Sequence, residues 1–525
     1  MARGPRLLIL GLDGVPYSLL MSWARAGHLP NLAAFAAEAA TAPLRCTVPP
    51  HTATGWPSLF HGRLPGEHGL FQFWDCQEPD YRLRPVSREE AGVPSLWDVL
   101  AGQGWTLGLL NIPMSHPPGP WPGYQITWPL LPTLHYVKPP DLARELASVG
   151  GHIRPDIACM YDGRPGYPER ALAYINGRTR ALLHLLRYRP VDAVALVFTE
   201  LDRVLHHFWH AADPRHPQHS QADPAGRTVI QSAFAAVDAA VGEILEAIPG
   251  DCAVLVVSDH GFGPGTRGVR LHSLLADGGF CQIPVGAGGE PKRGEGSDRD
   301  LEIHGTLPDL IWERTQAYMA APGSFGVNLN LEGRQRRGTV PRAQRDRVLA
   351  RLSGFLAGLE DPTGGPLFAA VVPAEEAYAG PFQDRAPDLL LVPADPALMV
   401  LCDIAGPMWS EPGQTGLHRL EGIWMLRAPG VAPGPRGEPM AVEAVAGHLL
   451  SVLGIVGEIP LRAETGLAEQ ALRAAGLPLD AWADDASCLL EWHGAPVADR
   501  TGLQPEPAEV TAAEIRERMR RMGYL

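Results

Sequence analysis

The chain has 525 residues, of which 45% are hydrophobic, so it can bury a core larger than that of one small domain. Its formal net charge of −14 is spread along the sequence, which argues against binding to nucleic-acid polymers, because these require a basic face. The seven cysteines are scattered without a C-x-x-C pair, so neither a disulfide scaffold nor a cysteine zinc site is expected.

The first predicted elements are a buried strand at 6–12, RLLILGL, and a helix at 16–27. This N-terminal stretch has features of a secretory signal, with two arginines before an apolar run. Asp13 interrupts the run, however, and the apolar part at 7–12 is too short for a signal. We therefore expect a cytoplasmic protein, and no apolar run is long enough to predict a membrane span.

Short apolar runs alternate with helical patterns along the rest of the chain. The strand candidates are 105–112, 191–199, 251–258, 387–394 and 422–429, and the helix candidates are 170–187, 226–247 and 445–454. This alternation predicts an α/β fold with a doubly wound, mostly parallel sheet and helices on both faces. The stretch 283–300 has no periodicity and is interpreted as a surface loop. A capping box from Thr511 to Glu514 predicts a closing helix at 511–525.

Carboxylates and imidazoles stand at the ends of the predicted strands, where ligands bind in such sheets. They occur in four separate stretches, and the residues are Asp13, Asp202, His206, Asp259, His260 and His418. Asp202 and His206 are spaced i, i+4 and so share one face of a helix. Asp259 and His260 are adjacent, and a turn after the strand would let both reach one point. The set predicts a metal site.

Each of these residues also has a structural interpretation. Asp13 could be only a helix N-cap, and Asp202 with His206 could be a surface pair beside Arg203 and Glu200. Asp259 and His260 are harder to explain structurally, because burying two polar groups without a partner is costly.

A candidate nucleophile lies in the segment 47–69, which is rich in Gly, Pro, Thr and Ser and leads into a predicted helix near Trp56. A hydroxyl at a helix N-terminus benefits from the backbone N–H groups and the helix dipole, which also favour a phosphate. Thr52 or Thr54 could supply this hydroxyl. An unassisted threonine is a weak nucleophile, so a divalent cation would be needed to activate it.

Several motifs in this order resemble the alkaline phosphatase superfamily, and more closely its type I phosphodiesterase/nucleotide pyrophosphatase branch. They are GLDG at 11–14, T-x5-S-x3-G from Thr52 to Gly62, LPGEHG at 64–69, D-R-V-x-H at 202–206, SDHGFG at 258–263 and H-R-x-E-G at 418–422. Further likenesses extend to the C-terminal MGYL, so the resemblance covers nearly the whole chain.

The resemblance implies a phosphoric ester hydrolase, a phosphodiesterase that uses two divalent metal ions and a phospho-threonine on Thr52. Zinc is the expected metal and manganese the alternative. One ion would be held by Asp13, Thr52, Asp259 and His260, and the other by Asp202, His206 and His418. The implied substrate is a small phosphate ester, whose identity the sequence leaves open, as it does the oligomeric state.

The resemblance also implies a division of the chain. Residues 1–265 and 381–470 would form the metal-binding catalytic core, 266–380 an insertion or cap, and 471–525 a C-terminal extension. Nucleotide pyrophosphatases usually carry an asparagine that contacts phosphate near the position of Phe73, so the resemblance does not extend to nucleotide specificity.

Other functions remain as alternatives. A phosphomutase or phosphomonoesterase would use the same site, and a non-catalytic binding protein could retain this fold. A sulfatase is disfavoured, since the segment at Cys46 lacks the C-x-P-x-R pattern.

Overall fold

The computed structural model describes residues 4–75, 79–81, 83–131, 133–151, 166–285, 307, 309–321, 325–404, 406–457, 459 and 482. The helix predicted at 511–525 and most of the loop predicted at 283–300 lie outside these residues.

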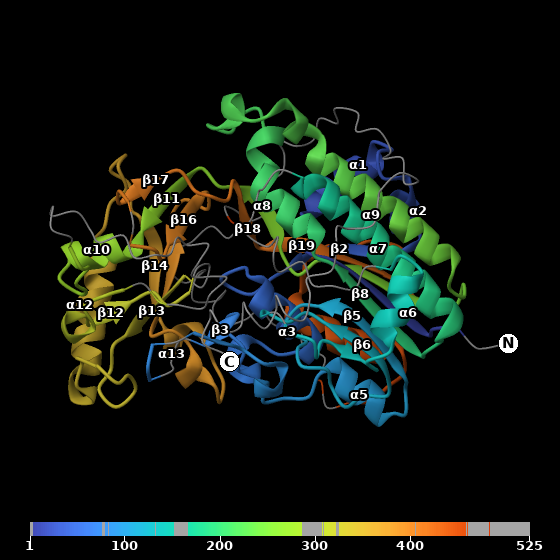
Figure 1. Ribbon diagram of the computed structural model, residues 1–525, viewed down its shortest axis with the longest axis horizontal. Helices are drawn as coiled ribbons and strands as arrows, with labels where there is room; N and C mark the ends of the chain where they lie inside the picture. Colours follow the sequence, from blue (N-terminus) through green and yellow to red (C-terminus); the bar gives the residue numbers. More distant parts are fainter. Residues whose placement is uncertain are drawn as a thin grey trace.

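A large central sheet confirms the predicted α/β class (Figure 1). Its strand order is β20-β2-β19-β9-β1-β8-β5-β6-β7, with β21 paired to β2. The strands are β1 (Leu7–Leu12), β2 (Ala40–Arg45), β5 (Leu107–Ile112), β6 (Gly123–Thr127), β7 (Val137–Lys138), β8 (Ala193–Phe198), β9 (Ala253–Val257), β19 (Glu421–Arg427), β20 (Gly434–Pro435) and β21 (Met440–Ala441). The central strands β9, β1, β8, β5 and β6 are parallel, while β19 and β7 run antiparallel to their neighbours.

Helices cover both faces of this sheet because its central strands are apolar on both sides. In β1, Leu8 and Leu10 contribute to one core and Leu7 and Ile9 to the other, as the alternation of side chains along a strand requires. The first core is covered by α1 (Tyr17–Arg25), α2 (Pro30–Glu38), α6 (Leu142–Ser148), α7 (Tyr167–Tyr188), α8 (Glu200–Ala212) and α9 (Val229–Glu246). The second is covered by α3 (Thr52–His61), α5 (Leu96–Gly102) and α14 (Val445–Val452), and α4 (Pro65–His68) follows α3.

Smaller sheets form a second lobe beside the central sheet, on the left in Figure 1. One contains β11 (Arg267–Arg270), β16 (Leu398–Leu401) and β17 (Trp409–Ser410), and another contains β12 (Ala317–Tyr318), β13 (Gly326–Leu329), β14 (Phe368–Pro373) and β15 (Leu389–Pro393). The helices α10 (Leu271–Asp277), α12 (Arg345–Ala357) and α13 (Ala374–Ala377) belong to this part of the chain. Two-stranded sheets pair β3 (Trp74–Asp75) with β4 (Arg84–Pro85), and β10 (Gly261–Pro264) with β18 (Gly416–Arg419).

One predicted strand lies in a different sheet from the one expected. The run at 387–394 was assigned to the large parallel sheet, but β15 pairs antiparallel with β13 and β14 in the second lobe. All five residues of β15 are buried. Its apolar sequence therefore predicts a central strand but does not indicate which sheet the strand joins. The division of the chain into a core, an insertion and an extension stays a prediction.

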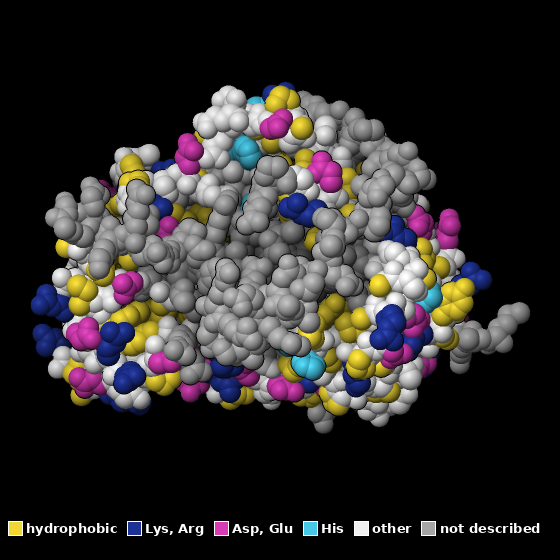
Figure 2. All heavy atoms as spheres, viewed as in Figure 1, with side chains coloured by type: hydrophobic (Ala, Val, Ile, Leu, Met, Phe, Trp, Pro, Cys, Tyr) yellow, Lys and Arg dark blue, Asp and Glu magenta, His cyan; other side chains and the backbone are white. Residues whose placement is uncertain are grey.

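Helix α9 and the preceding turn are long and apolar enough for a membrane span by length and composition, over Pro224–Glu246. Within the protein, however, 61% of an apolar stretch of 18 residues in this span is buried, and α9 packs against α2, α7 and α8. A core helix passes the same test of length and apolarity. Among the described residues on the face seen in Figure 2, acidic and basic side chains are intermingled, and neither sign gathers into one patch.

Candidate metal centre and active site

The predicted ligands come together at the carboxyl ends of three neighbouring strands. Asp13 directly follows β1, α8 with Asp202 and His206 begins just after β8, and Asp259 lies two residues beyond β9. In the sheet, β1 lies between β8 and β9. His418 arrives from β18, where it is paired opposite Phe262 of β10. The fold thus brings residues from four distant stretches to one edge of the sheet.

A tight turn after β9 directs Asp259 and His260 into the same site. The Ser258 hydroxyl donates to the carbonyl of His260 at 2.6 Å and accepts from the backbone N–H of Val15 at 2.8 Å. This closes the turn and ties it to the loop after β1. As a result, Nε2 of His260 lies 3.5 Å from Oδ2 of Asp259, although neighbours in a continuing strand would point to opposite faces.

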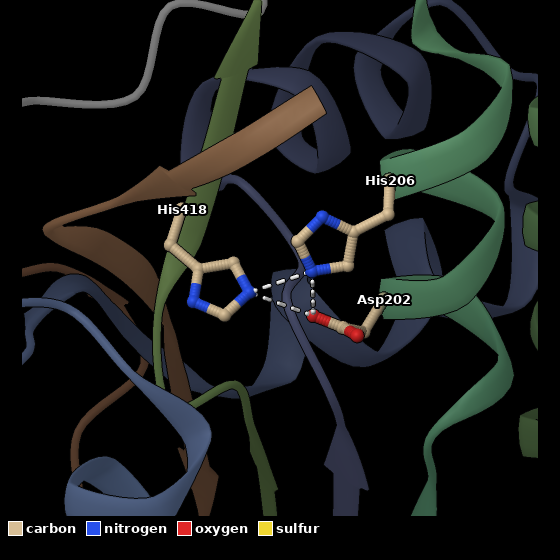
Figure 3. Close-up of side chains that lie close together, drawn as sticks. All are labelled: Asp202, His206 and His418. Carbon is tan, nitrogen blue, oxygen red and sulfur yellow. Dashed lines mark hydrogen bonds and ion pairs between the residues drawn. The ribbon is translucent and has the colours of Figure 1, made fainter. Parts of the chain in front are cut away.

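Asp202, His206 and His418 form one group of ligand atoms (Figure 3). Nε2 of His418 lies 3.2 Å from Oδ1 of Asp202 and 2.9 Å from Nε2 of His206. Nε2 of His206 is 3.6 Å from the same carboxylate oxygen. The three atoms therefore converge on one point from α8 and β18.

A second group surrounds His260. Its Nε2 lies 3.8 Å from Oδ1 of Asp13 and 3.8 Å from Oδ1 of Asp202. The Thr52 hydroxyl, at the first residue of α3, is 3.1 Å from the same nitrogen. Asp202 thus belongs to both groups, which places the two groups side by side.

The three imidazoles share one arrangement. Nδ1 donates to a backbone carbonyl in each: His206 to Gly416 at 2.8 Å, His260 to Gly261 at 3.1 Å and His418 to Pro50 at 3.2 Å. A carbonyl can only accept, so in the neutral ring the hydrogen is on Nδ1 and Nε2 presents a lone pair. Burial lowers the pKa of His206 to about 3 and that of His260 well below its usual value, which keeps both rings neutral. This is the arrangement of histidines that bind metals.

The buried carboxylates need cations. Both oxygens of Asp13, Oδ1 of Asp202 and Oδ2 of Asp259 are buried without a hydrogen-bond partner among the described residues. Burial and the neighbouring Asp259 raise the pKa of Asp13 well above its usual value, and burial raises that of Asp259 to about 7. Burial opposes ionisation of Asp202 too, but the nearby imidazole of His206 and the guanidinium of Arg203 lower its pKa well below the usual value. Charged groups held in this way are costly unless they are paired or bind metal, so these residues fit divalent ions.

The structural interpretations of these residues are not supported. Asp13 is no N-cap, because α1 is capped by Pro16 without a side-chain hydrogen bond. Asp202 is fully buried, and its Oδ2 accepts from Arg203 at 2.6 Å, so it is not part of a surface pair.

The geometry also distinguishes the two candidate hydroxyls. Thr54 Oγ1 donates to the carbonyl of His51 at 3.0 Å and shares a hydrogen bond with the hydroxyl of Thr47 at 2.6 Å. Of the two threonines, Thr52 is the one whose hydroxyl lies at the imidazole of His260.

Comparison with known families decides the class of protein. The sequence model of the family described as type I phosphodiesterase/nucleotide pyrophosphatase matches residues 7–418, well over half of the chain. The chain belongs to this family. It is therefore a hydrolase of the phosphodiesterase/pyrophosphatase type. The family is metal-dependent, in agreement with the two groups of candidate ligands. A search of curated proteins finds no match.

Solved structures share the fold of this chain at low sequence identity. Murine ectonucleotide pyrophosphatase/phosphodiesterase 5 is 12% identical with a TM-score of 0.50, over 88% of this chain and 97% of that chain. Phosphonoacetate hydrolase from Sinorhizobium meliloti 1021, in complex with phosphonoformate, is 15% identical with a TM-score of 0.52, over 85% of this chain and 96% of that chain. At these identities the likeness shows the fold alone.

A narrow cavity of about 90 Å³ opens onto the candidate site, and the sequence does not predict several of its lining residues. Thr52, His206 and His418 line it together with His51, Phe325 and Trp482. His51 could have been noticed as the neighbour of Thr52. No sequence pattern predicts Phe325 or Trp482 at the site. Phe325 belongs to the second lobe, and Trp482 lies 64 positions beyond His418 in the sequence (482 − 418).

Proposed function

We propose that the chain is a phosphodiesterase that cleaves a small phosphate or phosphonate ester through a phospho-threonine on Thr52, using two divalent metal ions. The observation that carries this is the position of Thr52, whose hydroxyl lies 3.1 Å from His260 beside buried carboxylates, several of whose oxygens have no hydrogen-bond partner among the described residues. The first ion would be held by Asp13, Thr52, Asp259 and His260, and the second by Asp202, His206 and His418.

The metals, when bound, would neutralise the carboxylates and make the threonine hydroxyl and the phosphoryl group more reactive. Asp and His ligands without cysteine suit zinc or manganese, and we propose zinc. The N-terminus of α3 presents backbone N–H groups where a phosphoryl group would lie beside Thr52.

The reaction would proceed in two displacements. Oγ1 of Thr52 forms a bond to phosphorus while the bond to the ester alcohol breaks, and the alcohol leaves with a proton. Water then attacks the phospho-threonine, the bond between phosphorus and Oγ1 breaks, and Thr52 regains its proton. Dividing the hydrolysis in this way replaces one difficult displacement by two easier ones.

The structural neighbours support a ligand of this class. The murine phosphodiesterase 5 has a structure as an inactive threonine-to-alanine variant in complex with AMP, and the Sinorhizobium hydrolase has one in complex with phosphonoacetate. Phosphate esters and phosphonates share a tetrahedral phosphorus with anionic oxygens, which is the chemistry the candidate site suits.

The test is turnover of bis(4-nitrophenyl) phosphate and of 4-nitrophenyl phosphate by the zinc-loaded protein. The diester should be the better substrate, and Thr52→Ala should lower its rate roughly a thousandfold or more, since loss of a nucleophile removes the covalent route. Thr54→Ala is the matched control and should keep most of the rate. Mass spectrometry of the rapidly quenched enzyme should place a phosphoryl group on the peptide that contains Thr52. Full activity of Thr52→Ala would disprove the mechanism.

A further inference from the structure

His51, the residue before Thr52, caps helix α3 with its imidazole ring. Nδ1 accepts the backbone N–H of Ala53 at 3.0 Å. A ring nitrogen that accepts a hydrogen bond carries no hydrogen, so in the neutral ring the hydrogen is on Nε2. Serine, threonine, aspartate and asparagine are the usual N-caps, and they would serve the helix as well. What histidine adds is an N–H donor on the far side of the ring.

This donor belongs to a side chain that lines the cavity containing Thr52 and His418. The ring is held by Phe73, with ring centroids 5.0 Å apart, and lies 6.1 Å from the ring of His418. Within the described part of the chain, no acceptor is bonded to Nε2. The N–H is therefore fixed in orientation and available to a group that enters the cavity.

The tautomer of His51 is opposite to that of the three candidate ligands. His206, His260 and His418 donate through Nδ1 and present lone pairs at Nε2, as metal ligands do. His51 accepts through Nδ1 and presents a hydrogen at Nε2, which suits a ligand with acceptor oxygens and does not suit a metal. Arg203 also lines the cavity, but it already donates to Asp202 at 2.6 Å.

We propose that His51 is a catalytic residue that donates a hydrogen bond from Nε2 to a phosphoryl oxygen of the substrate. This inference rests on the proposed function, because it assigns the acceptor to the group that Thr52 attacks. The N–H would stabilise the negative charge on that oxygen as the bond to Thr52 forms, and a fixed donor does so without reorganising. No proton is transferred in this role.

Two kinds of variant separate the donor from the helix cap. His51→Ser and His51→Asn provide preferred N-caps for the N–H of Ala53 but no donor that reaches as far as Nε2. His51→Gln places an amide N–H close to the position of Nε2. We expect His51→Ser and His51→Asn to lower kcat/KM about 10- to 100-fold, the range for a hydrogen bond to a charged group, and His51→Gln to restore it to within about threefold of the wild type.

Binding of inorganic phosphate gives a readout that does not depend on turnover. Calorimetry on the zinc-loaded protein should show phosphate bound about 10-fold more weakly by His51→Ser and His51→Asn, and nearly normally by His51→Gln. The metal content should match the wild type in all three variants, and the melting temperature should match it in His51→Ser and His51→Asn, which keep the helix cap. His61→Asn is the control, since His61 lies at the other end of α3 and donates through Nδ1 to the carbonyl of Val93.

Two results would overturn the assignment. One is normal turnover and phosphate affinity in a folded His51→Ser or His51→Asn variant. The other is an equal loss in all three variants, because the ring would then act through its shape and not through its N–H. If Thr52→Ala retains full turnover, the proposed function fails, while the phosphate affinities still test His51 separately.

Discussion

Three carboxylates from three strand ends surround one imidazole nitrogen in the candidate site. Nε2 of His260 lies within 3.5 to 3.8 Å of oxygens of Asp259, Asp13 and Asp202. The mutual repulsion of such groups is part of what raises the pKa of Asp13, and it opposes folding when no cation is present. Metal binding and folding stability should therefore be linked. Replacing one of these carboxylates by a neutral side chain should stabilise the metal-free protein and destabilise the metal-loaded protein.

Asp13→Asn tests this linkage. In excess chelator the variant should be more stable than the wild type, by about 1–3 kcal/mol of unfolding free energy. Burial and the neighbouring Asp259 oppose ionisation of the Asp13 carboxyl on folding, whereas an asparagine amide has no charge to lose. With zinc present the order should reverse, and diester hydrolysis should fall at least about 100-fold because a ligand is lost. Thermal melts with chelator and with zinc measure both effects.

Asp238→Asn is the matched control for that experiment. Its carboxylate is also buried, but it accepts from the backbone of Leu32 at 2.8 Å and from the side chain of Asn31 at 2.9 Å. It should destabilise the protein equally with and without zinc. An Asp13→Asn variant that behaves in the same way would mean that Asp13 does not face a metal.

At the residue scale, the sequence predicts the site residues that directly follow strands. It does not predict features of the site that depend on how helices pack in the folded protein. Asp13, Asp259 and His260 stand at strand ends, and the helical spacing of Asp202 and His206 is visible in the sequence. That Asp202 is shared between the two groups depends on how α8 is tilted, which no local pattern contains. The tautomer of His51 is likewise set by a hydrogen bond that only the folded helix makes.

At the scale of elements, helix α8 is held in place by a buried ion pair to α7. Nε of Arg178 donates to Oε1 of Glu200, the first residue of α8, at 2.7 Å, and both side chains are almost fully buried. Two residues later α8 carries Asp202. The ion pair therefore fixes the start of the helix that carries Asp202. Loss of the pair should weaken metal binding as well as lower the stability of the protein.

Arg178→Met should be strongly destabilising, by about 3–5 kcal/mol, because it removes the guanidinium that pairs with the buried carboxylate of Glu200. Urea unfolding of the metal-loaded protein measures the loss. The double variant Arg178→Met/Glu200→Met should recover much of it, since apolar side chains can replace a buried ion pair at little cost. If the single variant lost less than about 1 kcal/mol, the pair would not be what holds α8.

Most strands of the central sheet that border the candidate site could be predicted, because each is marked by its own apolar run in the sequence. The continuous apolar runs at 6–12, 191–199 and 251–258 correspond to β1, β8 and β9, shortened by one to three residues where polar groups begin. Pairing partners are not local, and β15 shows the consequence, since an apolar run is equally suited to either sheet. The short strands β10 and β18, which bring His418 to the site, are too brief to carry a pattern.

At the scale of the whole molecule, the cavity is lined by residues from the edge of the central sheet and from the second lobe. The edge of the central sheet supplies Thr52 and the candidate ligands, whereas the second lobe supplies Phe325 and the apolar pair Met399 and Val400. Trp482 completes this wall, with its ring 6.4 Å from that of Phe325. Under the proposed function, the edge of the central sheet would carry the chemistry, and these apolar and aromatic residues would contact the substrate.

Phe325→Ala should consequently change specificity without changing the chemistry. For a phosphodiester with a phenyl group, kcat/KM should fall about 10-fold, because the ring would lose an aromatic and apolar contact. For the corresponding methyl ester the change should stay below about twofold, since a methyl group is too small to make that contact. Phe355→Ala is the control, because Phe355 packs against Phe280, with ring centroids 5.4 Å apart, and is not among the residues that line the cavity. Equal losses on both esters would show that Phe325 supports the lobe and does not contact the ester group, and the apolar wall would then have no part in selecting the substrate.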